Sequence, residues 1–204
     1  MKGKHFDADV NLNDLINDDS VKKVNMEDYE IRPSRQSGKG GYSNTFEAIE
    51  KATMKRHVAI ILRDNSDEGQ TKNFINQIHI TSELSFPSII KFIGYGVTKK
   101  SRSPKHVILL ESAAKYTLSD MIYHNPVDFN DTKKHIILYG IASGMAYVHS
   151  LGYLHCNLKP ESIFLDENFF PKICDFSLAE EMTIKFSRVV DDTVLYIAPE
   201  VIEG

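Results

Sequence analysis

Short stretches in which apolar and polar residues alternate follow one another over residues 29–110, and this pattern is typical of β-strands. Residues 45–49 alternate in this way, and residues 57–62 form an apolar run rich in β-branched side chains. Two further strands are predicted at 89–94 and 107–110. The first half of the chain is therefore expected to form a β-sheet.

Helical spacing of apolar residues marks two other segments. Apolar residues recur at helical intervals over 72–84, which predicts one helix between the second and third strands. A second stripe lies within 131–151, and Gly152 just beyond it is a typical helix stop. This stripe consists of Ile137, Ile141, Met145 and Val148. After residue 111 the chain is therefore expected to be mainly helical.

The composition limits the class of protein. Hydrophobic residues make up 42% of the 204 residues, which is enough for a sizeable core and excludes global disorder. The apolar runs fall well short of the roughly 18 residues that a membrane helix needs, and no secretory signal is recognised. The net charge of −4 argues against a nucleic-acid partner, and two cysteines are too few for a disulfide framework or a zinc site. We therefore expect a cytoplasmic protein without a membrane or nucleic-acid partner.

The first 27 residues form a polar, acidic extension. Residues 1–30 contain four lysines and eight acidic residues, which accounts for the whole net charge. Residues 11–16 have the composition of a short helix, but no long apolar stripe supports a packed one. We therefore expect residues 1–27 to be a mobile extension.

Four local motifs occur in an informative order. A glycine-rich stretch, G-K-G-G-Y-S at 38–43, lies between two predicted strands, where glycines let backbone amides approach a phosphate. Further along the chain come H-C-N-L-K-P-E-S at 155–162, D-F-S at 175–177 and A-P-E at 198–200. The glycine-rich stretch alone is weak support, because turns use the same residues. The order and spacing of the whole set make chance an improbable explanation.

Together these motifs resemble the protein kinase family, whose signature set is a glycine loop, V-A-I-K, H-R-D-L-x-x-x-N, D-F-G and A-P-E. The K-P pair at 159–160 and the stretch K-F-I-G-Y at 91–95 are similar to the tyrosine-kinase-like branch of the serine/threonine kinases. The resemblance implies an α+β fold with two lobes. We expect an N-lobe over 28–114, with an antiparallel sheet and one helix, and a partial helical C-lobe over 115–204.

The resemblance also implies that an ion pair is missing from the N-lobe. Ile61 stands where the family has its phosphate-binding lysine, and Gln77 stands where it has the glutamate partner of that lysine. Loss of the lysine alone would leave a partly buried carboxylate unpaired, which is strongly destabilising. Neutral residues at both positions leave no charge unpaired, so the fold is expected to persist without the pair.

The catalytic loop carries further replacements. Asn157 stands where the family has the aspartate that accepts the substrate proton, and Ser162 stands at the metal-binding asparagine. Loss of a general base commonly lowers the rate by about 10²- to 10⁴-fold. Lys159 is retained and could meet a phosphate, and Asp175 is retained as the expected ligand of one Mg²⁺.

The resemblance also places the nucleotide site. An adenine ring would lie between Ala59 and Phe164, and backbone groups from Glu111 to Ala113 would bond its edge. The phosphates would lie under three loop glycines, Gly38, Gly40 and Gly41. Because Ser43 replaces the last glycine of the loop and Ile61 replaces the lysine, we expect binding of ATP and Mg²⁺ to be weak or absent.

The last expectation concerns the C-terminal side. The chain finishes four residues after A-P-E, before the helices that cover the C-lobe in the family. The stripe within 131–151 is therefore expected to be uncovered, either as a partner site or as an aggregation liability. This favours a fragment, a truncated gene model, or an incomplete lobe that another protein stabilises.

We interpret the chain as a catalytically inactive, pseudokinase-type protein that acts as a binding or regulatory module. The expected partner is a protein, either a signalling protein or an active kinase. Two alternatives stay open. One is an atypical active kinase that transfers phosphate from ATP to serine or threonine in a protein, and the other is a non-functional fragment of a longer kinase-like chain.

Overall fold

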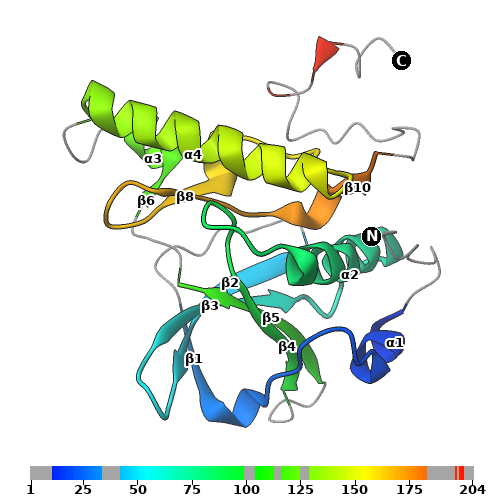
Figure 1. Cartoon of the computed structure of the whole chain (residues 1–204). Coiled ribbons are helices and arrows are strands. Elements are labelled where there is room, and N and C mark those ends of the chain that lie inside the picture. The colour runs from blue at the N-terminus through cyan, green and yellow to red at the C-terminus, as the bar shows by residue number, and fades with distance from the viewer. Residues whose placement is uncertain are drawn as a thin grey trace. The chain divides into compact units, whose positions relative to one another are not determined.

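The computed structural model describes residues 11–33, 42–98, 104–112, 116–124 and 129–182, together with Tyr196, Ala198 and Pro199. Contacts divide these residues into two compact units (Figure 1). The N-terminal unit comprises the described residues of 11–85 and 90–112. The C-terminal unit comprises those of 86–89 and 116–199.

A five-stranded antiparallel sheet forms the frame of the N-terminal unit, with the strand order β1-β2-β3-β5-β4. Its strands are β1 (Tyr29–Pro33), β2 (Ser43–Glu50), β3 (Arg56–Leu62), β4 (Phe92–Thr98) and β5 (Lys105–Glu111). The predicted sheet is confirmed. The strand predicted at 89–94 begins too early, because Ile89 forms an isolated bridge with Ile173 of the C-terminal unit, to which both residues belong.

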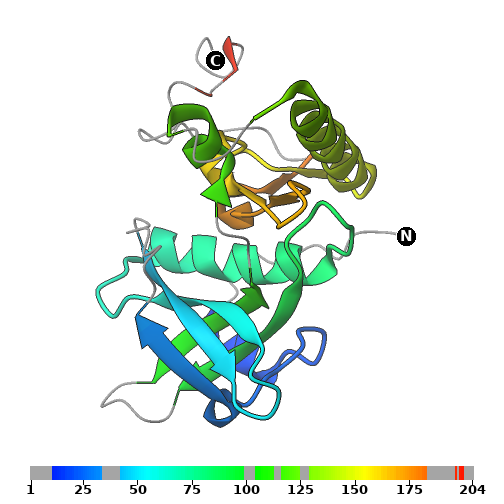
Figure 2. The same ribbon diagram turned by 90° about the vertical axis from the view of Figure 1, so that its left-hand side faces the viewer.

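One helix, α2 (Glu68–Glu83), lies across one side of this sheet (Figure 2). The helix begins four residues earlier than the apolar spacing predicted, because Asp67 caps it. The Asp67 carboxylate accepts the Gln70 N–H at 2.8 Å, and the Gln70 side chain accepts the Asp67 N–H at 3.2 Å. Phe74 and Ile78 on this helix are fully buried. The predicted helix of the N-lobe is therefore confirmed.

Residues 11–27 belong to the folded N-terminal unit, so the prediction of a mobile extension is wrong for this segment. The short helix α1 (Leu12–Asn17) buries Leu15 completely. The Lys23 ammonium donates to the backbone carbonyls of Leu15 and Asp18 at the end of α1. A cation at this end of a helix is favourable, because the last carbonyls lack partners within the helix.

The same segment covers the outer edge of β4. The Val24 N–H donates to the Tyr95 carbonyl and the Tyr95 N–H donates to the Lys22 carbonyl, each at 2.9 Å. Gly94 permits this approach, because a Cβ there would lie 2.5 Å from Val24 Cγ1. The segment therefore protects a sheet edge that would otherwise expose unpaired backbone groups.

The C-terminal unit combines two helices with several very short strands. Its helices are α3 (Leu118–Tyr123) and α4 (Asp131–Ser150). Its strands are β6 (Tyr116–Thr117), β7 (Tyr153–Leu154), β8 (Ile163–Leu165), β9 (Pro171–Ile173) and β10 (Glu180–Glu181). They form one sheet in the order β6-β8-β9 and a pair of β7 with β10. The C-terminal unit also contains two 3₁₀ turns, η2 (Pro160–Ser162) and η3 (Phe176–Leu178), and the N-terminal unit contains one, η1 (Met26–Asp28). The two units have the architecture expected of the two lobes of a kinase-like fold.

The buried face of α4 shows why the stripe is not uncovered. Ile137 and Val148 are 2% and 0% exposed, so the prediction of an uncovered stripe is wrong at these positions. Between them lie two buried glycines. A Cβ at Gly140 would lie 2.4 Å from Pro171 Cγ, and one at Gly144 would lie 2.9 Å from Ile173 Cδ1. The glycines therefore allow α4 to pack directly on β9.

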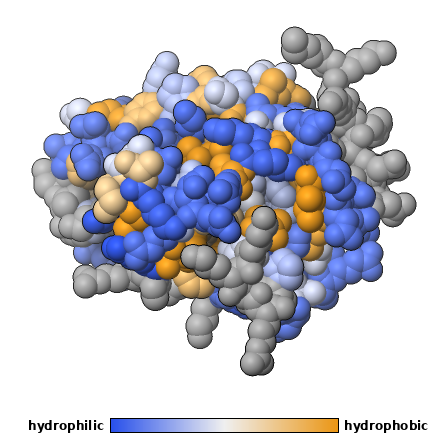
Figure 3. Space-filling view, turned by 90° about the horizontal axis from the view of Figure 1, so that it is seen from below, coloured by the Kyte–Doolittle hydropathy of each residue, from blue (hydrophilic) through white to orange (hydrophobic). Residues whose placement is uncertain are grey.

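Apolar residues also reach the surface. On the face that Figure 3 displays, they form small patches separated by hydrophilic residues, which is ordinary for a globular surface. Within the described residues, none of the helices combines the length and apolar character that would let it span a bilayer.

Candidate functional site

The N-terminal unit holds the residues predicted for the phosphate-binding strand, and an apolar cluster surrounds them. Ala59 on β3 is fully buried in a cluster with Ala48, Val107 and Leu109. Ile61, two residues along the same strand, packs against this cluster. An ammonium group at position 61 would have to lie against apolar side chains, which is unfavourable without a partner. Ile61 therefore serves the core of the lobe.

Gln77 lies on α2 and is 3% exposed. Its side-chain oxygen accepts a hydrogen bond from the Tyr42 hydroxyl at 3.1 Å. A neutral hydrogen bond thus fixes the side chain at the position where the resemblance implied one member of an ion pair. The two neutral replacements are consistent with each other, because neither leaves a charge unpaired.

The segment expected to bond an adenine edge is described only in part. The Glu111 N–H donates to the Lys91 carbonyl at 2.9 Å, and the Glu111 carboxylate accepts the Lys91 N–H at 3.1 Å. These bonds anchor the end of β5. The remaining predicted nucleotide contacts of this unit, Ala113, Gly38, Gly40 and Gly41, lie outside the described residues.

In the C-terminal unit a buried histidine organises the catalytic loop. His155 is 2% exposed, and its Nδ1 accepts the Asn157 N–H at 3.2 Å. Because a backbone N–H can only donate, the proton of the neutral ring lies on Nε2, which donates to the Cys174 carbonyl at 2.9 Å. Burial lowers the pKa of His155 and keeps the ring neutral. The ring thereby joins the catalytic loop to the segment that carries Asp175.

The centre of the site is a three-residue hydrogen-bonded group, Asn157, Asp175 and Ser177. The Asn157 amide Nδ2 donates to Asp175 Oδ2 at 2.7 Å, and the Ser177 hydroxyl donates to Asp175 Oδ1 at 2.7 Å. Both carboxylate oxygens of Asp175 are therefore held by neutral donors. Asn157 is 7% exposed and Ser177 is 4% exposed, so both donors are shielded from water, whereas the Asp175 acceptor is only partly buried.

Asp175 has an unusual backbone conformation. Its φ of 64° and ψ of 62° place it in the left-handed region, which costs a residue with a side chain about 1–2 kcal/mol. Asp tolerates this region better than most residues. The two short hydrogen bonds to its carboxylate offset the cost and fix the side chain in one orientation.

Ser162, the other expected metal position, is turned toward the backbone of its own loop. It is 3% exposed, and its hydroxyl donates to the Lys159 carbonyl at 2.8 Å and lies 3.2 Å from the Asn157 carbonyl. The same oxygen accepts the Lys159 N–H at 3.0 Å. This hydroxyl therefore closes the loop. By contrast, the Lys159 ammonium makes no hydrogen bond or ion pair within the described part of the chain, and the residue is half-buried.

Phe164 was predicted to contact an adenine ring from the C-terminal side. It lies at the centre of β8, between the buried residues Ile163 and Leu165, and is partly exposed. Its strand neighbours are Thr117 on β6 and Lys172 on β9. The short sheet therefore fixes the position of Phe164 within its own unit.

The geometry tests whether a magnesium ion fits. Mg²⁺ prefers an octahedral set of oxygen ligands, usually with one or two carboxylates. No group of three or more His, Cys, Asp or Glu side chains could hold a metal ion within the described residues. Both oxygens of the Asp175 carboxylate already accept a hydrogen bond, and the Ser162 hydroxyl is committed to its loop. A magnesium ion at Asp175 would therefore have to share this carboxylate with two donors and would gain no ligand from Ser162.

The sequence identified the replaced positions but missed the bonds that compensate for them. In the sequence, Tyr42 is part of the glycine-rich stretch, Ser177 is the third residue of D-F-S, and His155 is the first residue of H-C-N-L-K-P-E-S. None of the three was predicted to make a compensating hydrogen bond. Each of these three residues has a polar side chain. Because Ser177 lies only two residues from Asp175, the sequence could have predicted that its hydroxyl donates to that carboxylate. The partners of Gln77 and Asn157 are 35 and 18 residues away, respectively, so no local pattern indicates them.

Comparisons with known proteins agree with this fold. The family model described as the protein kinase domain matches residues 31–204. The chain is 25% identical to cysteine-rich receptor-like protein kinase 26 of Arabidopsis thaliana, over 98% of this chain and 30% of the relative. It is 27% identical to the receptor-like cytosolic serine/threonine-protein kinase RBK2 of the same plant, over 95% of this chain and 45% of the relative. A probable serine/threonine-protein kinase of Dictyostelium discoideum is 29% identical, over 95% of this chain and 21% of the relative. The chain thus spans less than half the length of these relatives.

Proposed function

Because the chain belongs to the protein kinase family, we propose that it is a catalytically inactive member that acts as a binding or regulatory module. In this proposal the chain engages a protein partner, either a signalling protein or an active kinase, in the cytoplasm. It does not engage nucleic acid or a membrane. Its relatives are named as serine/threonine and receptor-like kinases, so in this proposal the partner takes part in signalling by kinases of these classes.

The observation that carries the proposal is the bonding of Asp175. In phosphoryl transfer, a metal ion held by such a carboxylate neutralises the developing charge on the phosphates. Here an amide and a hydroxyl donate to the two carboxylate oxygens at 2.7 Å each. A cation would have to displace or share these donors, so the arrangement favours a site that works without metal.

The missing base and lysine support the same proposal. The Asn157 amide has no useful basicity at neutral pH, so it cannot accept the proton of an attacking hydroxyl. In the N-terminal unit, Ile61 packs in an apolar cluster and Gln77 is held by Tyr42. Neither can offset phosphate charge. We therefore propose weak or absent binding of ATP and no phosphoryl transfer.

One observation favours the alternative of an atypical active kinase. The ammonium of the half-buried residue Lys159 has no hydrogen-bond or ion-pair partner among the described residues, and Lys159 lies in the same loop as Asn157. A lysine without a partner could meet a phosphate group. In that case Asp175 would have to release its two donors when nucleotide binds.

Two measurements on the full chain test the proposal. Thermal unfolding with ATP, in the presence and absence of Mg²⁺, reports nucleotide binding. Incubation with γ-labelled ATP and a generic protein substrate reports transfer. We expect no magnesium-dependent rise in the melting temperature and no transfer above the level of an Asp175→Ala variant. Transfer that this substitution abolishes would establish the active-kinase alternative.

A further inference from the structure

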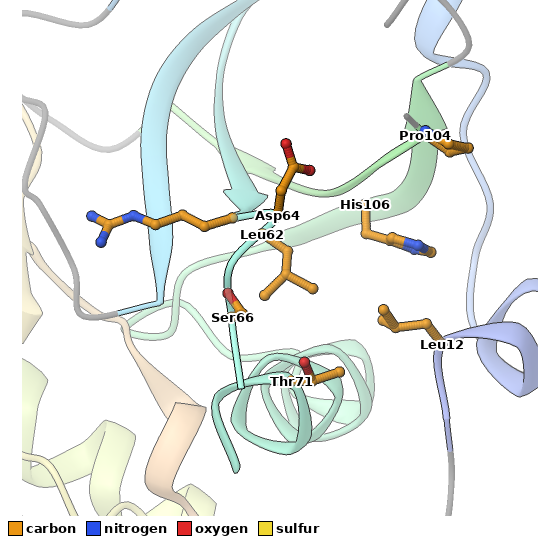
Figure 4. A pocket seen from close by; sticks show the side chains of 8 residues that line it. Leu12, Leu62, Asp64, Ser66, Thr71, Pro104 and His106 are labelled. Atoms are coloured by element: carbon orange, nitrogen blue, oxygen red, sulfur yellow. The ribbon is translucent and has the colours of Figure 1, made fainter. Parts of the chain in front are cut away.

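A cavity of about 220 Å³ lies in the N-terminal unit (Figure 4), and none of its lining residues belongs to a motif that carries the kinase resemblance, although Leu62 directly follows Ile61. Its walls come from α1, from the end of β3, from the connection to α2 and the first turn of that helix, and from the start of β5. The lining residues are Leu12, Leu62, Arg63, Asp64, Ser66, Thr71, Pro104 and His106. Because α1 supplies one wall, the cavity depends on the N-terminal segment that packs against this unit.

The charged residues of the lining are engaged elsewhere. Arg63 Nε donates to Asn44 Oδ1 at 3.1 Å, and the Asp64 carboxylate forms an ion pair with Lys105. In Figure 4 the Asp64 carboxylate points away from Leu62 and from the centre of the cavity. Arg63 is bonded to a neutral amide and Asp64 to an ammonium, so both charged groups already have partners, and a charged ligand would lose its hydration on entering the cavity, which is unfavourable. The cavity favours a neutral ligand.

The hydrogen bond between His106 and Tyr95 determines which ring nitrogen of His106 carries the proton. Its Nδ1 lies 2.5 Å from the Tyr95 hydroxyl, and the two rings are nearly parallel, with centroids 6.0 Å apart. Burial raises the pKa of Tyr95 to about 12, so the phenol keeps its proton. Tyr95 is 1% exposed and its hydroxyl has no other hydrogen-bond partner among the described residues, so we assign the phenol as the donor to Nδ1. Burial also lowers the pKa of His106, which keeps the ring neutral. The ring proton therefore lies on Nε2, which has no hydrogen-bond partner among the described residues.

The other polar groups of the lining turn their protons away. The Ser66 hydroxyl donates to the Tyr42 carbonyl at 3.0 Å, and the Thr71 hydroxyl donates to the Asp67 carbonyl at 2.9 Å. His106 and Leu12 both line the cavity, and Figure 4 shows the imidazole of His106 lying above the Leu12 side chain. A ligand in this cavity would therefore meet the Nε2–H as a donor, and apolar surface from Leu12 and Leu62. It would need one hydrogen-bond acceptor.

The volume sets the size of the ligand. A cavity of about 150 Å³ lined by apolar side chains is known to bind benzene, whereas drug-sized ligands occupy about 300–1,000 Å³. The volume here lies between these values. It corresponds to a molecule with one ring and a small substituent.

We propose that this cavity binds a compact, neutral, one-ring molecule whose oxygen accepts a hydrogen bond from His106 Nε2–H. The ring lies against Leu12, Leu62 and Pro104. Because Leu12 belongs to α1, the ligand binds only when α1 is packed on the lobe, and it stabilises the N-terminal segment. The proposal does not depend on whether the chain transfers phosphate.

The first test compares two probes of nearly the same shape, acetophenone and α-methylstyrene, which lacks the carbonyl oxygen. Each is titrated into the ¹⁵N-labelled full chain, and amide shifts are followed by NMR. We expect saturable shifts for residues around the cavity, with acetophenone binding about 2- to 12-fold more tightly because of one net hydrogen bond. Equal affinities would overturn the donor role of His106. The absence of shifts around the cavity with both probes would overturn the site.

The second test fills the cavity. A Leu12→Trp variant places a larger side chain in it, whereas Ile16→Trp makes a similar change on the same helix at a residue that is 47% exposed and outside the lining. We expect Leu12→Trp to abolish the shifts and Ile16→Trp to leave them unchanged. Binding retained in a folded Leu12→Trp variant would overturn the proposal. If that variant does not fold, the comparison of the two probes still decides it.

Discussion

The substitution Asn157→Asp tests the bonding of Asp175 directly. In the native protein the Asn157 amide donates to Asp175 Oδ2 at 2.7 Å. An aspartate of the same shape would place a second carboxylate against the first and would remove the donor. The resemblance to active kinases gives the change a second meaning, because it restores the family's catalytic acid-base residue. The variant should therefore lose stability even though it moves toward the family pattern.

The magnitude follows from the distance. Two like charges about 2.7 Å apart repel by about 6 kcal/mol at an effective dielectric constant of about 20. Uptake of a proton limits this penalty, because an ordinary carboxyl pKa of about 4 and about 1.4 kcal/mol per pH unit give at most about 4 kcal/mol at pH 7. Asp175 is only partly buried, so solvent screening reduces the effect further. We expect a loss of about 1–3 kcal/mol at neutral pH.

The assay is urea unfolding of the full chain at several pH values, with and without Mg²⁺. The folded variant shares a proton between two carboxylates that the unfolded chain releases, so its deficit relative to the wild type should shrink as the pH falls toward about 5. Mg²⁺ should restore stability to the variant, because two carboxylates form a better site than one. The wild type should not respond to Mg²⁺ at all.

An Asn157→Ala variant is the matched control. It leaves one oxygen of the partly buried Asp175 carboxylate without its donor, which costs at most about 1–3 kcal/mol, but it introduces no second charge. Its deficit should therefore vary little with pH and should not respond to Mg²⁺. If Asn157→Asp is as stable as the wild type at neutral pH, or if its deficit is independent of pH, the proposed hydrogen bond to Asp175 is refuted.

Three further substitutions test the packing and the loop. Ile61→Lys should lower the free energy of unfolding by about 1–3 kcal/mol, because the ammonium meets an apolar cluster. Its control, Ile61→Met, should lower it by less than about 1.5 kcal/mol. Equal losses for the two variants in chemical denaturation would argue against the apolar cluster around Ile61. Gly140→Ala should cost about 1–3 kcal/mol, because the new Cβ would lie 2.4 Å from Pro171 Cγ, while Ala146→Ser on the exposed side of α4 should change stability by less than about 0.5 kcal/mol. Burial lowers the pKa of His155, so near pH 6.5 the unfolded chain binds a proton that the folded chain does not bind. The free energy of unfolding should therefore decrease as the pH falls below about 6.5. A His155→Gln variant should show a weaker pH dependence of this free energy in chemical denaturation.

The larger elements of the fold could be predicted because their signals are local. β3 contains a continuous apolar run, residues 58–62, that is rich in branched side chains, and α2 repeats apolar residues at helical spacing. The strands β6 to β10 could not be predicted, because two or three residues are too few to show a period. The buried glycines of α4 were missed for another reason: a glycine carries no apolar side chain, although it marks the closest contact of the helix.

The N-terminal segment shows the limit of pattern reasoning most clearly. Leu15, Val21 and Met26 are buried, yet the apolar residues of this polar stretch are few and form no long periodic stripe. Their burial depends on a lysine that caps α1 and on pairing with the edge of β4, which the local sequence does not indicate. Prediction of the candidate site met the same limit. The replaced residues could be identified one by one, but the neutral bonds that satisfy Gln77 and Asp175 join segments far apart in the chain.

Binding of Mn²⁺ tests the central claim most directly, because this ion substitutes for Mg²⁺ and broadens the NMR signals of nearby amides. The measurement is a titration of the ¹⁵N-labelled full chain with Mn²⁺ in the presence of ATP. The account predicts that the amides of Asn157, Asp175 and Ser177 keep their intensities at stoichiometric metal, while Asn157→Asp loses them. Selective broadening of these amides in the wild type would contradict the claim that neutral donors have taken the place of the metal.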